Sequence, residues 1–483
     1  MNNFQLIYRK YFYFLIGILF IFIPLFPKFP LENISGTFVA IRYEDVLIAL
    51  VVFVWFVFNI RNLRKYFSNI IFQAFILFWL IGLLSLFSGI FITHTISLKL
   101  ALFHWLRRVE YMSLFLIAAT SVSSLNQAKF LIKISLVGAL IVIFYGFGQI
   151  YFNFPVISTT NREFSKGLIL YLTNGARVNS TFAGHYDLAM YLSIILMIIA
   201  TNFFYYRKIL NKLMIAFVGF ISFALLGLTA ARVSFVATIL GLAAVFWLNQ
   251  KKVLLVLLIF LVIASVGLIP ELRHRLVATV TVNLLNGGGP KYTPAPGTIT
   301  DFTPIDQIPE NIRQQVLEDR AKRAANPGSP STIVYKDTVA GEPVNSTELG
   351  VYRSFGIRLN VEWPRAINSF LRNPFLGTGY SSISLATDND FLRSLGEVGI
   401  LGTLSLALIF YILIKSLLKV FNQSQGFEKY YLLSMITSVV VILVTATVID
   451  VLEASKVAEL LWIWLGIAWA IITDYKLGKN ENE

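Results

Sequence analysis

The sequence contains no cysteine, which excludes disulfide bonds, thiolate metal sites and a cysteine nucleophile. It has only four histidines, so a histidine-rich metal centre is not expected. Charged residues make up 14% of the 483 residues, about half of their share in a soluble domain. Hydrophobic residues make up 57%. A soluble globular protein is thereby excluded, and an all-α polytopic membrane protein is predicted.

Apolar runs of about 17–25 residues, the length that crosses a bilayer as a helix, recur along the whole chain. We predict about twelve membrane spans, with one large external segment between the ninth and the tenth. The predicted spans are 11–27, 44–60, 70–92, 96–122, 129–151, 186–205, 214–230, 233–249, 253–269, 394–417, 430–449 and 456–473. The chain thus divides into 1–269 with nine spans, 270–393 as the external segment, and 394–483 with three spans and a tail.

Lysine and arginine in the short connections predict the orientation of the spans. Every second connection is basic, and these connections contain Arg9, Lys10, Arg61, Arg64, Lys65, Lys129, Lys133, Arg207, Lys208, Lys212, Lys251, Lys252, Lys415, Lys419, Lys429, Lys476 and Lys479. Both chain ends are therefore predicted to be cytoplasmic. Because this pattern explains the net charge of +14 as a topology signal, nucleic-acid binding is not expected.

The external segment 270–393 is polar and nearly balanced in charge. Two stretches in it, 309–325 and about 352–372, follow a helical pattern. Pro364 is expected to start a helix, since a proline inside one costs about 3 kcal/mol. Loops of this length without a domain of their own are usually functional. The chemistry is therefore expected on the external face.

Four polar clusters surround the external segment. They are 177–187 before the sixth span, 228–234 between the seventh and eighth, Arg358 with 362–363 and 373–380, and 388–392 followed by 397–402. Under the predicted topology all four lie at the same face of the membrane. Arginines gathered there suit a phosphate-bearing ligand, because their forked donors match phosphate oxygens.

In this order the clusters resemble the O-antigen ligase and O-antigen polymerase family of bacterial envelope enzymes. That family has an arginine turn between two spans, then a periplasmic loop with a second arginine, a tryptophan and a Pro-x-x-Gly-x-Gly segment, here 374–379. In that family a His-Asn pair and a Glu-x-Gly-x-x-Gly segment close the loop. The corresponding residues here are Asp388 with Asn389, and 397–402. The resemblance covers roughly residues 175–410. This sequence departs from the pattern where two alanines separate Thr229 from Arg232 and where Asp388 replaces the histidine of the ligases. An Asp-Asn pair at 388–389 is more similar to the polymerase branch, which we favour.

The resemblance implies a glycosyltransferase of the bacterial inner membrane that uses no metal or cofactor. Its donor is a glycan on polyprenyl pyrophosphate, its acceptor is another glycan, and its implied protein partners are a flippase and a chain-length regulator. Arg232 and Arg358 are expected to stabilise the leaving pyrophosphate, and Asp388 to accept the acceptor's proton with inversion at the anomeric carbon. The expected substrate-binding residues are Arg177, His185, Asp187, Asn389, Arg107 and Glu397.

Each candidate also has a structural interpretation. Arg232 is suited to anchoring its turn in lipid headgroups, and Arg358 to a solvated ion-pair face. Asp388 is suited to capping the helix that follows, in which case His185 and Asp187 are the alternative proton acceptors. Arg107, Arg108 and Glu110 lie inside an apolar run. Arg107 and Glu110 form either a structural pair or a lining for a phosphate cavity.

Two other functions remain open at this point. A ligase that moves finished glycan onto lipid A core or another acceptor has nearly the same sequence pattern. A transporter or flippase of lipid-linked sugars belongs to a different class and predicts two pseudo-symmetric halves. No repeat of the first half of the chain is evident in the second, which disfavours the transporter.

Overall fold

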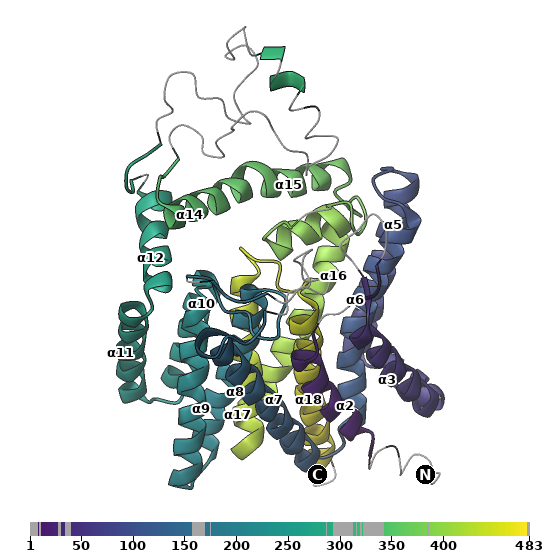
Figure 1. Ribbon diagram of the computed structural model, residues 1–483. Helices are drawn as coiled ribbons and strands as arrows, with labels where there is room; N and C mark the ends of the chain where they lie inside the picture. The colour runs from purple at the N-terminus through teal and green to yellow at the C-terminus, as the bar shows by residue number, and fades with distance from the viewer. Residues whose placement is uncertain are drawn as a thin grey trace. The chain divides into compact units, whose positions relative to one another are not determined.

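The computed structural model is that of an all-α membrane protein with one short two-stranded sheet (Figure 1). It describes residues 8, 11–27, 30–33, 40–156, 170–173, 175–285, 287–292, 313–314, 316–318, 321, 342–383 and 386–480. Within these ranges a helix overlaps every predicted span. The stretch predicted to be helical at 309–325 lies largely outside them, and its described residues are helical.

The first half of the chain is built from α2 (Tyr13–Leu25), β1 (Pro30–Asn33), β2 (Ala40–Arg42), α3 (Tyr43–Asn59), η1 (Ile60–Asn62), α4 (Leu63–Phe67), α5 (Ile70–Phe91), α6 (Leu98–Ser121), α7 (Leu125–Tyr151) and α8 (His185–Tyr205). The second half contains α9 (Ile209–Leu228), α10 (Arg232–Leu248), α11 (Lys252–Leu268), α12 (Pro270–Ala278), η3 (Thr279–Leu284), α14 (Ser346–Ile357), η5 (Arg358–Glu362), α15 (Trp363–Arg372), α16 (Asp390–Phe421), α17 (Gly426–Thr445) and α18 (Ser455–Asn480).

Eight helices of the described chain are long and apolar enough to cross a membrane, and α11 continued into Pro270–Leu284 makes a ninth if the two form one bent span. The helices α2 and α10 are shorter, with 13 and 17 residues. The helix α6 has 24 residues, but Arg107, Arg108 and Glu110 interrupt its apolar surface. The protein is therefore a multi-pass membrane protein.

The chain forms two compact units, 1–272 with 360–483 and 273–359. In the larger unit α18 packs along α6, α16 along α5, and α17 along α8 (Figure 1). In the smaller unit α14 packs on η3. Because α15 packs on α16, residues 360–393 belong to the larger unit, although the sequence pattern groups them with the external segment.

Local signals explain where several helices begin. The Asn345 side chain accepts hydrogen bonds from the main-chain N–H groups of Thr347 and Glu348, 2.9 and 3.2 Å away, and caps α14. The helical stretch predicted from about 352 therefore begins earlier, at Ser346. Pro364 lies in the first turn of α15, as predicted, where its missing N–H costs no helical hydrogen bond.

Candidate functional site

The Pro-x-x-Gly-x-Gly segment, residues 374–379, packs against a break in α16. The backbone of Gly399, with φ 67° and ψ −170°, interrupts that helix. Just before the break, the N–H of Thr378 donates to the carbonyl of Gly396 at 2.9 Å, and the N–H of Gly379 donates to that of Glu397 at 2.8 Å. Two of the motifs that carry the resemblance are therefore one structural element.

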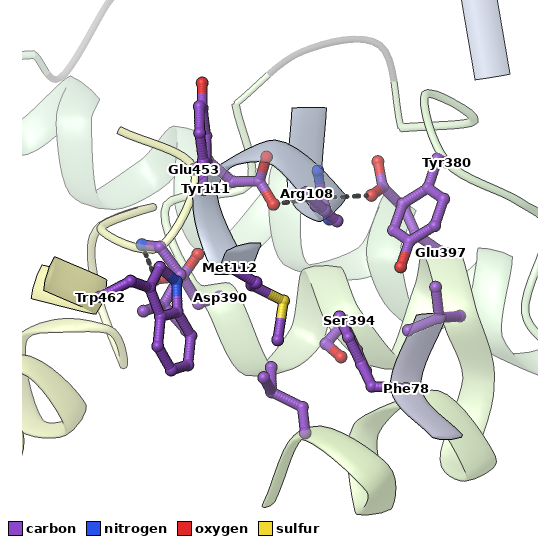
Figure 2. A pocket seen from close by; sticks show the side chains of 13 residues that line it. Phe78, Arg108, Tyr111, Met112, Tyr380, Asp390, Ser394, Glu397, Glu453 and Trp462 are labelled. Atoms are coloured by element: carbon purple, nitrogen blue, oxygen red, sulfur yellow. Dashed lines mark hydrogen bonds and ion pairs between the residues drawn. The ribbon is translucent and has the colours of Figure 1, made fainter. Parts of the chain in front are cut away.

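Beside this element, Arg108 of α6 lies in a buried charged network. Its guanidinium group lies between the carboxylates of Glu453 and Glu397 and pairs with both, the second at 3.3 Å (Figure 2). The group also lies 4.5 Å from the ring centre of Tyr380. The adjoining cavity measures about 60 Å³, room for only a few water molecules. Sequence reasoning noted Arg108 only as a charge inside an apolar run, and it did not select Glu453.

The network continues through Arg393, which pairs with Asp450 at 3.0 Å and with Glu397 at 3.5 Å. Asp450 also accepts hydrogen bonds from the main-chain N–H groups of Thr387 and Asn389, at 2.9 and 3.1 Å. The start of α16 is thereby fastened to the connection between α17 and α18.

The side chain of Asp390 also attaches the start of α16 to the connection between α17 and α18. Its carboxylate accepts hydrogen bonds from the N–H groups of Val451 and Leu452, at 2.8 and 2.9 Å. The side chain of Asn389 accepts from the N–H of Leu392 at 3.0 Å and so caps α16. The interpretation of Asp388 as the cap is therefore wrong. Asp388 is half-buried and has a left-handed backbone, with φ 49°.

This network contains more negative than positive groups. Its carboxylates are Asp390, Glu397, Asp450 and Glu453, and its guanidinium groups are Arg108 and Arg393. The network holds the loops together, and Glu397 and Asn389 take part in it. Their expected contact with substrate stays a prediction.

A second group of candidates lies where α8 and α10 begin. These helices run parallel, since Thr238 donates a 2.6 Å hydrogen bond to Ser193 and, further along both helices, Gly241 packs against Met197. Arg232, the first residue of α10, and Asp187 of α8 each precede this hydrogen-bonded pair by six residues, about 1.7 turns, and so lie at a similar height in the bundle.

Arg177 and His185 meet at the same end of α8. One Nη atom of Arg177 lies 2.5 Å from Nε2 of His185, and its guanidinium group lies 5.8 Å from the ring centre of Tyr186. Arginine can only donate, so Nε2 of His185 accepts this hydrogen bond and is not protonated. Four predicted residues, including Asp187 and Arg232, thus lie at the N-termini of two parallel helices, an arrangement that favours an anion.

Lys456 joins this end of the bundle to the charged network. Its ammonium group is buried and donates to the carbonyls of Thr181, at 2.7 Å, and Pro24, at 3.2 Å. It also lies 5.1 Å from the ring centre of Phe182. Because the connection 446–456 contacts both groups of candidates, they lie at the same end of the bundle.

Arg107 faces away from the network, toward α3. It pairs with Asp45 at 3.4 Å and, with Glu110, lines a cavity of about 630 Å³ between the two helices. Arg358 belongs to the smaller unit, where it donates to the carbonyl and hydroxyl oxygens of Ser354 at 3.2 and 2.7 Å. The site described here therefore uses residues of the larger unit only.

The Glu453 carboxyl predicts how stability depends on pH. Burial raises its pKa, but Arg108 and Arg393 outweigh burial and hold the pKa below its ordinary value. A carboxyl whose pKa is lower in the folded protein stabilises the fold above its unfolded pKa, and this stabilisation is lost on acidification. We expect the unfolding temperature of the detergent-solubilised protein to fall below about pH 5, as the pH passes the ordinary glutamate pKa of about 4.3 and approaches the lower pKa of the folded protein.

The Glu453→Gln variant tests this assignment. It should have a lower unfolding temperature at pH 7 and a shallower fall on acidification, since its amide cannot ionise. Glu318 is exposed, so Glu318→Gln should behave as the unaltered protein. An equal slope in Glu453→Gln and in the unaltered protein would assign the acid sensitivity to other groups.

No protein-family model matches this sequence, and no curated protein matches it.

Proposed function

We propose that the protein is a glycosyltransferase that extends glycans carried on polyprenyl pyrophosphate, at the external face of the bacterial inner membrane. Both chain ends would then be cytoplasmic. The observation that supports this best is the grouping of Arg177, His185 and Arg232 at the N-termini of α8 and α10. The same end of the bundle carries the interlocked motifs on which the resemblance rests.

The reaction proposed needs positive charge at the leaving group. When the bond between the anomeric carbon and the phosphate oxygen breaks, the pyrophosphate takes both electrons of that bond. Arg232 and Arg177 are suited to stabilise this charge, because guanidinium groups bind phosphate oxygens through two parallel hydrogen bonds. Donors fixed in advance by helices and loops supply the largest single contribution in many enzymes.

The acceptor hydroxyl must lose a proton as its oxygen attacks the anomeric carbon. Asp388 is our proposed proton acceptor, since it lies directly before the capped start of α16 and is half-buried. The rival acceptor, His185, already uses Nε2 to accept from Arg177. Attack on the face opposite the pyrophosphate inverts the anomeric configuration.

Replacing Asp388 by asparagine is expected to reduce glycan transfer by about 10²–10⁴-fold, the usual contribution of a general base. The fold should not suffer, because asparagine adopts the left-handed backbone as readily as aspartate does. The rate of the unaltered enzyme should fall on the acid side of its pH profile, and that limb should vanish in Asp388→Asn. The measurement is the initial rate of glycan extension against pH.

His185→Gln is the matched comparison, and it should retain most of the activity. If Asp388→Asn is active and His185→Gln is inactive with its protein level unchanged, the base lies at the start of α8 and Asp388 serves the turn only.

A further inference from the structure

One side of α15 is apolar and exposed. Ile367 and Leu371, which lie one helical turn apart, are 44% and 64% exposed. Phe375 follows at the same spacing, just beyond the end of the helix, and is 67% exposed. We call these three residues the apolar row. An exposed row of this kind marks a surface that lipid or another protein covers.

The other sides of α15 are packed or polar. Ala366 is fully buried against α16, where a Cβ on Gly396 would lie 2.9 Å from the carbonyl oxygen of Ala366. Arg365 and Asn368 lie on a third side, and Asn368 is exposed. The helix lies across the direction of α5 and α16 (Figure 1). An amphipathic helix in this orientation is typical of the interface between lipid chains and headgroups.

The end of α15 lies at the depth where α5 leaves the bilayer. The side chain of Asn373, directly after α15, donates a 2.7 Å hydrogen bond to the hydroxyl of Ser88, near the end of α5. At 1.5 Å per residue, Ser88 lies about 27 Å from Ile70, the first residue of that helix. Because the hydrocarbon layer of a bilayer is about 30 Å thick, Asn373 lies at its boundary.

Phe375 connects the apolar row to the lipid-facing surface of α16. Its carbonyl oxygen accepts a 3.2 Å hydrogen bond from the N–H of Leu401. Leu401 and Leu404 are exposed, as expected of a surface in contact with lipid. Leu401 lies about 27 Å from Lys419, in the last turn of α16. The lengths of α5 and α16 therefore place the end of the row at the same boundary of the bilayer.

We propose that α15 lies in the interface of the bilayer at this end of the bundle, with the apolar row among the lipid chains and Asn368 toward the headgroups and water. Phospholipid covers the row, because the row continues the exposed surface of α16 at the depth where two spanning helices leave the bilayer. The inference needs only that α5 and α16 cross the membrane, so it does not rest on the proposed function. Through Asn373 and Phe375, the helix holds the element formed by the two motifs at the bilayer surface.

Two consecutive residues on different sides of α15 test the proposal. The chain contains no cysteine, so Ile367→Cys and Asn368→Cys can each be labelled at one position with nitrobenzoxadiazole, in full-length protein reconstituted in phosphatidylcholine vesicles. An interfacial helix buries its apolar side about 5–10 Å deep. The label at position 367 should therefore emit at shorter wavelength and lose most of its intensity when the lipid chains are brominated, whereas the label at position 368 should keep most of its intensity.

Two results of this experiment would overturn the proposal. Equal quenching at the two positions would show that α15 does not insert its apolar side into the bilayer. A label at position 367 that emits at short wavelength but is shielded from brominated lipid would show that a second copy of the chain covers the row.

Leu371→Asp tests the apolar row by loss of insertion. A carboxylate among lipid chains is costly, so in a chain that carries Ile367→Cys this change should reduce the quenching to that of the label at position 368. Asn368→Asp, on the polar side, is the matched control and should leave the quenching at position 367 unchanged. Because Leu371 is largely exposed, the unfolding temperature in detergent should not change. Unchanged quenching in the Leu371→Asp protein would contradict the proposal.

Discussion

Replacing Arg232 by alanine is expected to reduce glycan transfer by about 10²–10³-fold, the usual cost of removing one donor that stabilises transition-state charge. The variant should nevertheless reach the membrane at normal levels. Arg232 is the first residue of α10, where a positive charge opposes the helix dipole. Alanine there should therefore leave the helix as stable as before, so the expected loss is chemical and not structural.

Arg232→Lys and a distant arginine are the controls for this prediction. Lysine should restore only part of the activity, because an ammonium group cannot bind two phosphate oxygens as a fork. Arg372 is exposed in the last turn of α15, and Arg372→Ala should retain full activity. Initial rates and membrane protein levels are measured for each variant. Full activity in Arg232→Ala would contradict the catalytic role and indicate that Arg232 only anchors its turn.

Replacing Gly399 by alanine is expected to destabilise the protein by about 3 kcal/mol or more, since a strained backbone conformation alone costs about 1–3 kcal/mol. The residue has φ 67° and ψ −170°, a region that is essentially restricted to glycine. An added Cβ would also lie 2.4 Å from main-chain atoms of Phe375 and 2.6 Å from the nitrogen of Gly377. These backbone atoms cannot yield without opening the element formed by the two motifs.

Thermal unfolding of the detergent-solubilised protein measures this effect. Gly350 lies within α14, and a Cβ there meets nothing within 4 Å. Gly350→Ala should therefore be neutral or slightly stabilising, because alanine is the better helix former. An unfolding temperature for Gly399→Ala equal to that of Gly350→Ala would show that the break in α16 is not required for the fold.

The membrane-spanning helices could be predicted because each apolar run contributes the hydropathy of about twenty residues to one signal. A helix overlaps each predicted range, and the turn between α9 and α10 falls at 229–231, slightly earlier than the gap between the predicted spans 214–230 and 233–249. The start of α16 was placed four residues late, at 394. Hydropathy rises only there, whereas the helix begins at the cap formed by Asn389. A helix end that depends on one capping side chain cannot be located by averaging hydropathy over many residues.

The charged network was not predictable from motifs. Arg108 was visible as a charge inside a span, but Glu453 follows it by more than 300 residues and belongs to no motif. One signal was present in the sequence. A buried arginine in a membrane requires a carboxylate partner, and the short connection between α17 and α18 contains both Asp450 and Glu453. In contrast, Gly377 and Gly399, whose backbones approach each other closely, both belong to motifs that sequence reasoning had selected, although their contact was not predicted.

Glycan transfer by the purified protein tests the proposed function most directly. The full-length protein is reconstituted in vesicles with a polyprenyl-pyrophosphate-linked oligosaccharide as both donor and acceptor, and lipid-linked products are separated by size. We expect lipid-linked glycans of two, three and more repeat units, with one polyprenyl pyrophosphate released per new linkage. Absence of both extension and released carrier would contradict the proposal, as would transfer that occurs only after lipid A core is added.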